Sequence, residues 1–155
     1  MTEEFLRTAI WLAREKMREG AGGPFGAVIV KDGEIIARGW NQVTSSNDPT
    51  AHAEIVAIRA ACHRLGSFRL EGCDLYSSCE PCPMCLAALY WARIGRLFYA
   101  ASRLDAREAG FDDDLLYREI CLPPDQRVLP ASQALREEAL LALDEWKAKS
   151  DKIGY

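Results

Sequence analysis

The sequence predicts a mixed α/β domain in which helices cover both faces of one sheet. A helical pattern opens the chain, two short apolar runs joined by a tight turn follow it, and helical and strand patterns then alternate. A hairpin followed by such an alternation gives a sheet that is partly antiparallel and partly parallel. Because the chain has 155 residues, 49% of them apolar, and shows no repeat or linker, we expect a single domain over residues 1–155.

The N-terminal part predicts a helix and a hairpin. Apolar residues recur at helical spacing from Phe5 to Met17, and Gly20 begins a glycine-rich stretch that ends this helix. Asp-Gly at 32–33 is a typical two-residue hairpin turn, so the apolar runs on either side of it are expected to pair as antiparallel strands. The expected strands are residues 26–31 and 34–40.

The middle of the chain predicts helices that alternate with strands. Residues 41–50 are polar and are expected to form a loop before the next helix, which Gly66 closes as a C-cap. A proline at position 81 fits the first turn of the following helix, where its missing N–H costs nothing. The expected helices are residues 51–65 and 81–93, and the expected strands are residues 74–78 and 96–101.

The last part of the chain predicts two helices and one further strand. A polar segment leads into a short helix expected over residues 114–119, and a fifth short strand is expected near 127–130. Residues 131–149 predict a last amphipathic helix, because apolar residues recur on one face from Leu135 to Trp146.

The composition of the chain limits which kinds of partner it can bind and in which cellular compartment it is expected. The net charge is −4 and the chain has no run of Lys or Arg, so a small uncharged substrate is expected rather than a nucleic acid. No apolar run approaches the length of a membrane span, and the charged N-terminal stretch differs from a secretory signal. The six cysteines are therefore expected in a reducing, cytoplasmic environment, where C-x-x-C is more often metal-binding or catalytic than a disulfide.

Two short motifs together predict a metal site. His-Ala-Glu at 52–54 and Pro-Cys-Pro-Met-Cys at 81–85 each open a helix, where the partial positive charge favours thiolate over thiol. A structural zinc site normally has four protein ligands, whereas a catalytic one leaves a position for water. Three ligands with a carboxylate, Glu54, beside them therefore predict one catalytic zinc ion per chain and hydrolytic chemistry. The expected ligands are His52, Cys82 and Cys85.

Other interpretations of the cysteines stay open at this point. A redox pair would also use C-x-x-C, although here a proline stands between the two cysteines and a histidine motif lies upstream. Cys79 extends the run to C-x-x-C-x-x-C, as in iron–sulfur proteins, but Leu89 occupies the place of a fourth cysteine. His63 cannot join the site, because the helix places it roughly 16 Å from His52. A closed structural zinc site is the main competitor of a catalytic one.

Beyond these motifs, the chain resembles the cytidine-deaminase-like zinc hydrolases and, within them, the small bacterial guanine deaminases. The broad resemblance rests on the two metal motifs and on residues 23–30, which read GPFGAVIV. The match runs from about residue 22 to the end of the chain. The narrower resemblance rests on Asn41, SNDPTAHAE at 46–54, YWAR at 90–93, EAGFDD at 108–113 and the terminal Tyr155.

The resemblance implies a three-layer α/β/α sandwich around a mixed five-stranded sheet. It also implies that guanine is deaminated to xanthine, with zinc-bound hydroxide as the nucleophile at C2 and Glu54 as the proton shuttle. Asn41 and Asp113 would hydrogen-bond the purine, Phe25 would pack beside its ring and Tyr155 would close the pocket.

The resemblance further implies a homodimer. In the family the C-terminal segment, about residues 131–155 here, can be exchanged between protomers, so Tyr155 would act on the neighbouring subunit. The family also leaves other substrates open, because one fold hosts several amines: guanosine, cytosine or an aminotriazine. Two further alternatives are a tRNA adenosine deaminase, which the acidic balance disfavours, and a zinc-stabilised module without activity.

Overall fold

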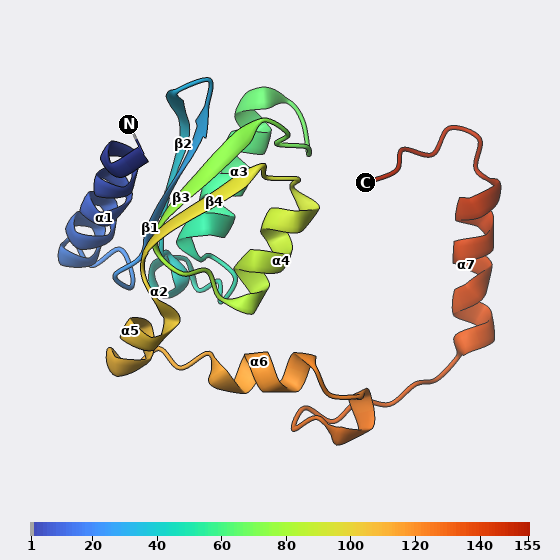
Figure 1. Cartoon of the computed structure of the whole chain (residues 1–155). Coiled ribbons are helices and arrows are strands. Elements are labelled where there is room, and N and C mark those ends of the chain that lie inside the picture. Colours follow the sequence, from blue (N-terminus) through green and yellow to red (C-terminus); the bar gives the residue numbers. More distant parts are fainter. Residues whose placement is uncertain (1) are drawn as a thin grey trace. The chain divides into compact units, whose positions relative to one another are not determined.

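The computed structural model describes residues 2–155. They fall into two compact units, one that ends at Asp113 and one from Asp114 to Tyr155. The first unit contains the sheet, drawn from blue through yellow in Figure 1.

One mixed sheet of four strands, in the order β2-β1-β3-β4, forms the centre of the first unit (Figure 1). Strand β1 (Gly26–Lys31) pairs in antiparallel fashion with both β2 (Glu34–Trp40) and β3 (Cys73–Cys79). Strand β4 (Arg96–Ala101) lies at the other edge and runs parallel to β3. The predicted mixed α/β class is confirmed.

The turn between β1 and β2 lies at the predicted residues. Asp32 and Gly33 have φ angles of 51° and 81°, and positive φ at both central residues is the requirement of a type I′ turn. The turn fixes the register, in which Lys31 lies opposite Glu34. Both strands have their predicted bounds.

Helices cover both faces of the sheet, as predicted. Helix α1 (Thr2–Arg18) packs on one face, where Leu12 meets a cluster that includes Val28 and Tyr76. Helices α3 (Ala53–Leu65) and α4 (Pro83–Trp91) pack on the other face (Figure 1). The result is the three-layer α/β/α arrangement that the resemblance implied.

Two glycines let the helices lie directly on the strands. A Cβ atom at Gly26 would lie 2.3 Å from the carbonyl oxygen of Ala9 in α1. A Cβ atom at Gly39 would lie 2.1 Å from the carbonyl oxygen of Ala53 in α3. The second contact matters for function, because it sets the position of the residues that begin α3.

The predicted fifth strand near 127–130 is wrong. In the described part of the chain these residues follow a 3₁₀ helix, Pro124–Gln126, and have no strand partner. Pro124, which precedes this stretch, and Pro130, its last residue, carry no N–H. The N–H of Val128 donates to the Glu119 carboxylate at 2.7 Å. A side chain thus takes the donor that a strand partner would need.

The helices of the second unit, and two short helices of the first, differ from expectation in detail. Helix α6 is Asp114–Ile120, and α7 is Arg136–Ala148 rather than 131–149. Helices α2 (Val43–Ser46) and α5 (Arg103–Glu108) were not predicted. No helix within residues 2–155 has the length and apolar character needed to cross a bilayer.

Candidate active site

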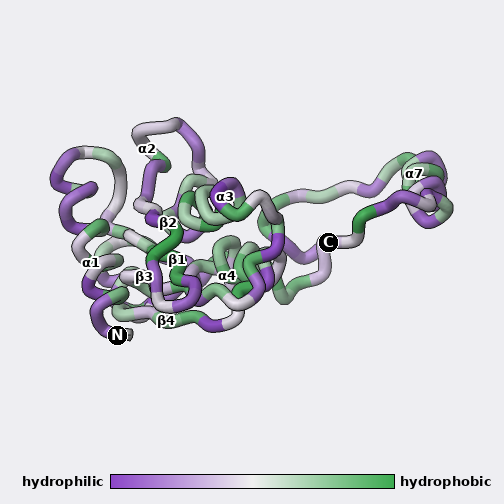
Figure 2. The backbone as a smooth tube through the Cα atoms, turned by 90° about the horizontal axis from the view of Figure 1, so that it is seen from above, coloured by the Kyte–Doolittle hydropathy of each residue, from purple (hydrophilic) through white to green (hydrophobic). Residues whose placement is uncertain are grey.

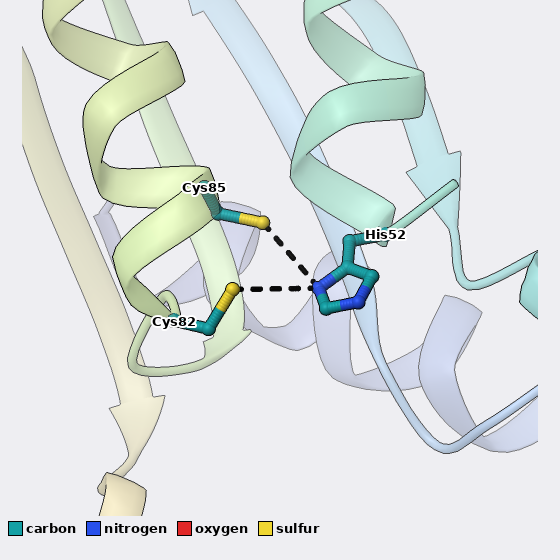
Figure 3. Close-up of side chains that lie close together, drawn as sticks. All are labelled: His52, Cys82 and Cys85. Carbon is teal, nitrogen blue, oxygen red and sulfur yellow. Dashed lines mark hydrogen bonds between the residues drawn. The ribbon is translucent and has the colours of Figure 1, made fainter. Parts of the chain in front are cut away.

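The three predicted metal ligands come together at one end of the sheet. His52 Nδ1 lies 3.6 Å from Cys82 Sγ and 3.5 Å from Cys85 Sγ (Figure 3). All three ligand atoms lie within 4.8 Å of one another, and within residues 2–155 no other group of three His, Cys, Asp or Glu side chains does so. His63 is exposed on α3, as predicted.

The starts of two helices hold these ligands. His52 is the N-cap of α3 and Cys82 is the N-cap of α4; both have extended backbone angles, and neither side chain caps its helix. Pro83 occupies the first turn of α4, where it needs no N–H partner. Cys85 follows in the same turn, so the side chains of Cys82 and Cys85 are neighbours, as in a capping box. Both sulfurs face His52 (Figure 3).

The protonation of the cluster fits a divalent cation. The Cys82 sulfur forms hydrogen bonds with the Cys85 side chain and, with a smaller effect, with His52. These bonds lower the pKa of the Cys82 thiol to about 4. The same hydrogen bond, with burial, raises the pKa of Cys85. One thiolate therefore forms readily, and the second needs a positive charge between the sulfurs. Two sulfurs and an imidazole nitrogen form a donor set that zinc prefers.

A buried carboxylate lies beside the ligands. Glu54 is in the first turn of α3 and is 6% exposed, and its Oε1 accepts a hydrogen bond of 3.2 Å from the Ser77 hydroxyl. Burial is the main cause that raises the pKa of this carboxyl group. A carboxyl group with a raised pKa can both accept and return a proton near neutral pH.

Glu54 and two of the ligands, His52 and Cys82, line a cavity of about 500 Å³. Three of the residues predicted to bind substrate, Phe25, Asn41 and Asp113, line the same cavity. The fourth, Tyr155, belongs to the second unit, where it is 74% exposed.

Asn41 is held in a fixed orientation. Its Oδ1 accepts hydrogen bonds from the backbone N–H groups of Gly23 and Val43, each at 3.2 Å. Because two N–H donors face the same end of the amide, that end is the oxygen. The amide nitrogen is therefore the atom left to face other partners. Gly22 makes this arrangement possible, since a Cβ atom there would lie 2.0 Å from the Asn41 carbonyl oxygen.

Two residues of the cavity wall had no predicted role. Phe111 packs edge-on against Phe25, with ring centroids 4.8 Å apart and planes at 83°. Glu80 accepts a hydrogen bond of 3.0 Å from the backbone N–H of Arg103, the first residue of α5. The signal for α5 was present in the sequence, because Ser102 and Asp105 have the spacing of a capping box and form one.

Comparisons with known proteins agree with this geometry. Residues 1–101 match the family model described as the cytidine and deoxycytidylate deaminase zinc-binding region. The guanine deaminase of Bacillus subtilis is 56% identical over 153 residues, which cover 99% of this chain and 98% of that protein. A tRNA-specific adenosine deaminase of Aquifex aeolicus is 46% identical over 108 residues, which are 70% of each chain.

Two solved structures superpose on this chain. The crystal structure of the Bacillus subtilis guanine deaminase superposes with a TM-score of 0.96, at 56% identity and with 99% of this chain covered and 98% of that one. A mutant protein solved in complex with 8-azaguanine superposes with a TM-score of 0.70, at 34% identity over 73% of this chain and 65% of that one.

Proposed function

Since this chain belongs to the zinc-binding cytidine and deoxycytidylate deaminase family, we propose that it hydrolyses guanine to xanthine and ammonia. The observation that carries the proposal is one cavity that unites a three-ligand metal site with a buried carboxylate. Three protein ligands leave a fourth position for water, which hydrolysis needs and a structural zinc site lacks. The full-length similarity to a guanine deaminase gives the substrate.

His52 Nδ1 and the sulfurs of Cys82 and Cys85 would hold one zinc ion per chain. When bound, zinc lowers the pKa of a water molecule to about 7, so that a nucleophile is present at neutral pH. The neutral tautomer of His52 with its proton on Nε2 is the one that binds through Nδ1.

Glu54 is the proposed proton shuttle. In the overall reaction, the oxygen of one water forms a bond to C2 of guanine, the bond from C2 to the exocyclic nitrogen breaks, and ammonia leaves. Glu54 takes one proton from the water and gives it to a ring nitrogen, and it then carries the second proton, from the new hydroxyl group at C2, to the departing amine. Its burial suits the task, because a raised pKa brings the protonated form closer in free energy to the ionised form.

The purine is recognised by residues of the cavity wall. Asn41 donates from its amide nitrogen to an acceptor of the base, since its oxygen is occupied by backbone donors. The Asp113 carboxylate accepts from an N–H group at the edge of the base. Phe25 packs beside the ring, and Phe111 holds the Phe25 ring from the side.

The exposed apolar side chains of the second unit indicate a partner, which we propose is a second copy of this chain. None of this unit's helices has a buried residue, and α7 carries both hydrophilic and hydrophobic residues (Figure 2). Its 42 residues expose Leu129, Leu141 and Trp146 by 77%, 63% and 41%, and a segment of that size cannot bury such side chains alone. We propose that residues 131–155 pack on the partner in a homodimer of single-domain subunits, with Tyr155 closing the partner's cavity.

The competing substrates are separated by a steady-state assay of ammonia release on zinc-replete protein. We expect turnover of guanine and much slower turnover of guanosine, cytosine, adenosine and tRNA. A tRNA substrate is disfavoured by the net charge of −4, because binding to phosphates requires contacts from Lys and Arg. Comparable rates on guanosine would contradict closure by Tyr155, and no release from any base would indicate a non-catalytic zinc module. A cytoplasmic location fits six cysteines that are all free.

A further inference from the structure

Ser77 is a polar residue in an otherwise apolar row of β3. Alternate side chains of a strand point to the same face, so Ser77 lies in the row of Cys73 and Leu75, both of which are 0% exposed members of the core cluster beneath α3. Ser77 itself is 1% exposed. A hydroxyl group buried in such a row is unfavourable unless it forms hydrogen bonds, so its partners indicate its role.

Those partners fix the direction of the hydroxyl proton. The Ser77 Oγ lies 3.2 Å from Oε1 of Glu54, which joins the middle of the sheet to the start of α3. The backbone N–H of Cys79 points at the same Oγ from 3.5 Å. Because the N–H can only donate, the hydroxyl group accepts from Cys79 and gives its own proton to the carboxylate.

We propose that Ser77 is a positioning residue whose hydroxyl group holds Oε1 of Glu54 and so fixes the orientation of the carboxylate that exchanges the proton. This rests on the proposed function, because Ser77 acts only through Glu54. The hydrogen bond ties one oxygen of the carboxylate to β3, so the side chain keeps one orientation through the reaction.

Removing only the hydroxyl group tests the proposal. We expect Ser77→Ala to lower kcat for guanine by about tenfold or more, the size of a lost hydrogen bond to a charged group. KM and zinc content should stay within about twofold of the wild type, because Ser77 does not line the cavity and its hydrogen bonds go to Glu54 and Cys79, neither of which is a metal ligand. Ser77→Thr and Ser77→Val have the same shape and differ in the hydroxyl group, so the Thr variant should exceed the Val variant in kcat by a similar factor.

Ser78 provides the matched control on the same strand. It is also buried, at 9% exposure, and its Oγ accepts a hydrogen bond of 3.0 Å from the backbone N–H of Gly26. Ser78→Ala leaves that N–H without its partner and should reduce resistance to urea. Its kcat per folded molecule should remain that of the wild type.

A crystal structure of Ser77→Ala provides a readout that does not depend on activity. We expect the Glu54 carboxylate to turn or to occupy more than one orientation. Wild-type kcat in Ser77→Ala, equal kcat in the Thr and Val variants, or a loss of activity that follows a loss of zinc would each overturn the proposal. If wild-type protein did not deaminate guanine, the proposed function would fail, and an unchanged Glu54 orientation would still overturn the role of Ser77.

Discussion

At the scale of single residues, the site combines groups that water would normally surround. Among the residues whose side chains are described, Glu54 is the only acidic residue that is buried. Its burial is favourable only if a nearby positive charge or a transferable proton compensates for lost hydration. Both are expected in this cavity, because the metal ligands lie next to it and the reaction moves protons.

Glu54→Gln should leave the site assembled and remove proton transfer. Gln has the same shape, and its oxygen can still accept the bond from Ser77. We expect kcat to fall by about 10²–10⁴-fold, the usual contribution of a general acid–base. Zinc content and the urea midpoint should stay close to wild type. Retention of most activity in a zinc-loaded Glu54→Gln variant would show that another group carries the proton.

Asn41→Asp separates the two functions of the Asn41 amide. The carboxylate keeps an acceptor for the N–H groups of Gly23 and Val43, and it removes the amide donor. We expect kcat/KM for guanine to fall about tenfold or more while stability is largely preserved. Asn41→Ala should lose both properties, at a cost of about 1–3 kcal/mol in the free energy of unfolding. If Asn41→Asp bound guanine normally, Asn41 would be only a structural residue.

At the scale of elements, sequence patterns succeeded where a local rule fixed the chain. The hairpin was predicted because Asp32-Gly33 meets the positive φ requirement of its turn. The end of α3 was predicted because Gly66 adopts the left-handed conformation, with φ 59°. The metal ligands could be predicted because both motifs begin helices. The fifth strand was wrong because strand pairing depends on distant partners, and here the Glu119 side chain takes the Val128 N–H.

The same limit applies to parts of the cavity wall. Helix α2 lies in a polar stretch without an apolar period, so no pattern predicted it. The contact of Phe25 with Phe111 joins residues far apart in the sequence, and only the fold brings them together. Cys79 is buried and Cys62 is half-buried, and neither belongs to the group of metal ligands.

Gly39→Ala tests whether the contact between α3 and β2 positions the site. The added Cβ atom would lie 2.1 Å from the Ala53 carbonyl oxygen, so α3 must shift at its first turn. We expect a loss of about 1–3 kcal/mol in the free energy of unfolding, together with lower zinc affinity and lower kcat. Gly95→Ala is the control, because its nearest contact would be 3.4 Å. Unaltered zinc affinity in Gly39→Ala would contradict this role of the contact.

At the scale of the whole molecule, the two units differ in how they bury apolar residues. The first unit has a core on each face of its sheet. The second has helices without buried residues, so its stability is expected to come from packing on a partner. Solution behaviour should therefore depend on the C-terminal segment.

If the proposed dimer forms through residues 131–155, deletion of this segment should leave a monomer and abolish guanine turnover. The metal ligands lie in the first unit, so zinc should remain bound. Light scattering and elemental analysis measure the two properties. Tyr155→Ala is the companion variant, and it should lower activity while the dimer persists. A truncated monomer with wild-type kcat would contradict the proposed exchange.

The most direct test of the whole account is a zinc titration of metal-stripped protein, followed by ammonia release from guanine. We predict that activity rises linearly with added zinc and reaches its plateau at one equivalent per chain, with Cys82→Ser and Cys85→Ser failing to reach it. Full activity in metal-free protein, or no ammonia from folded protein that holds one zinc ion per chain, would contradict the account.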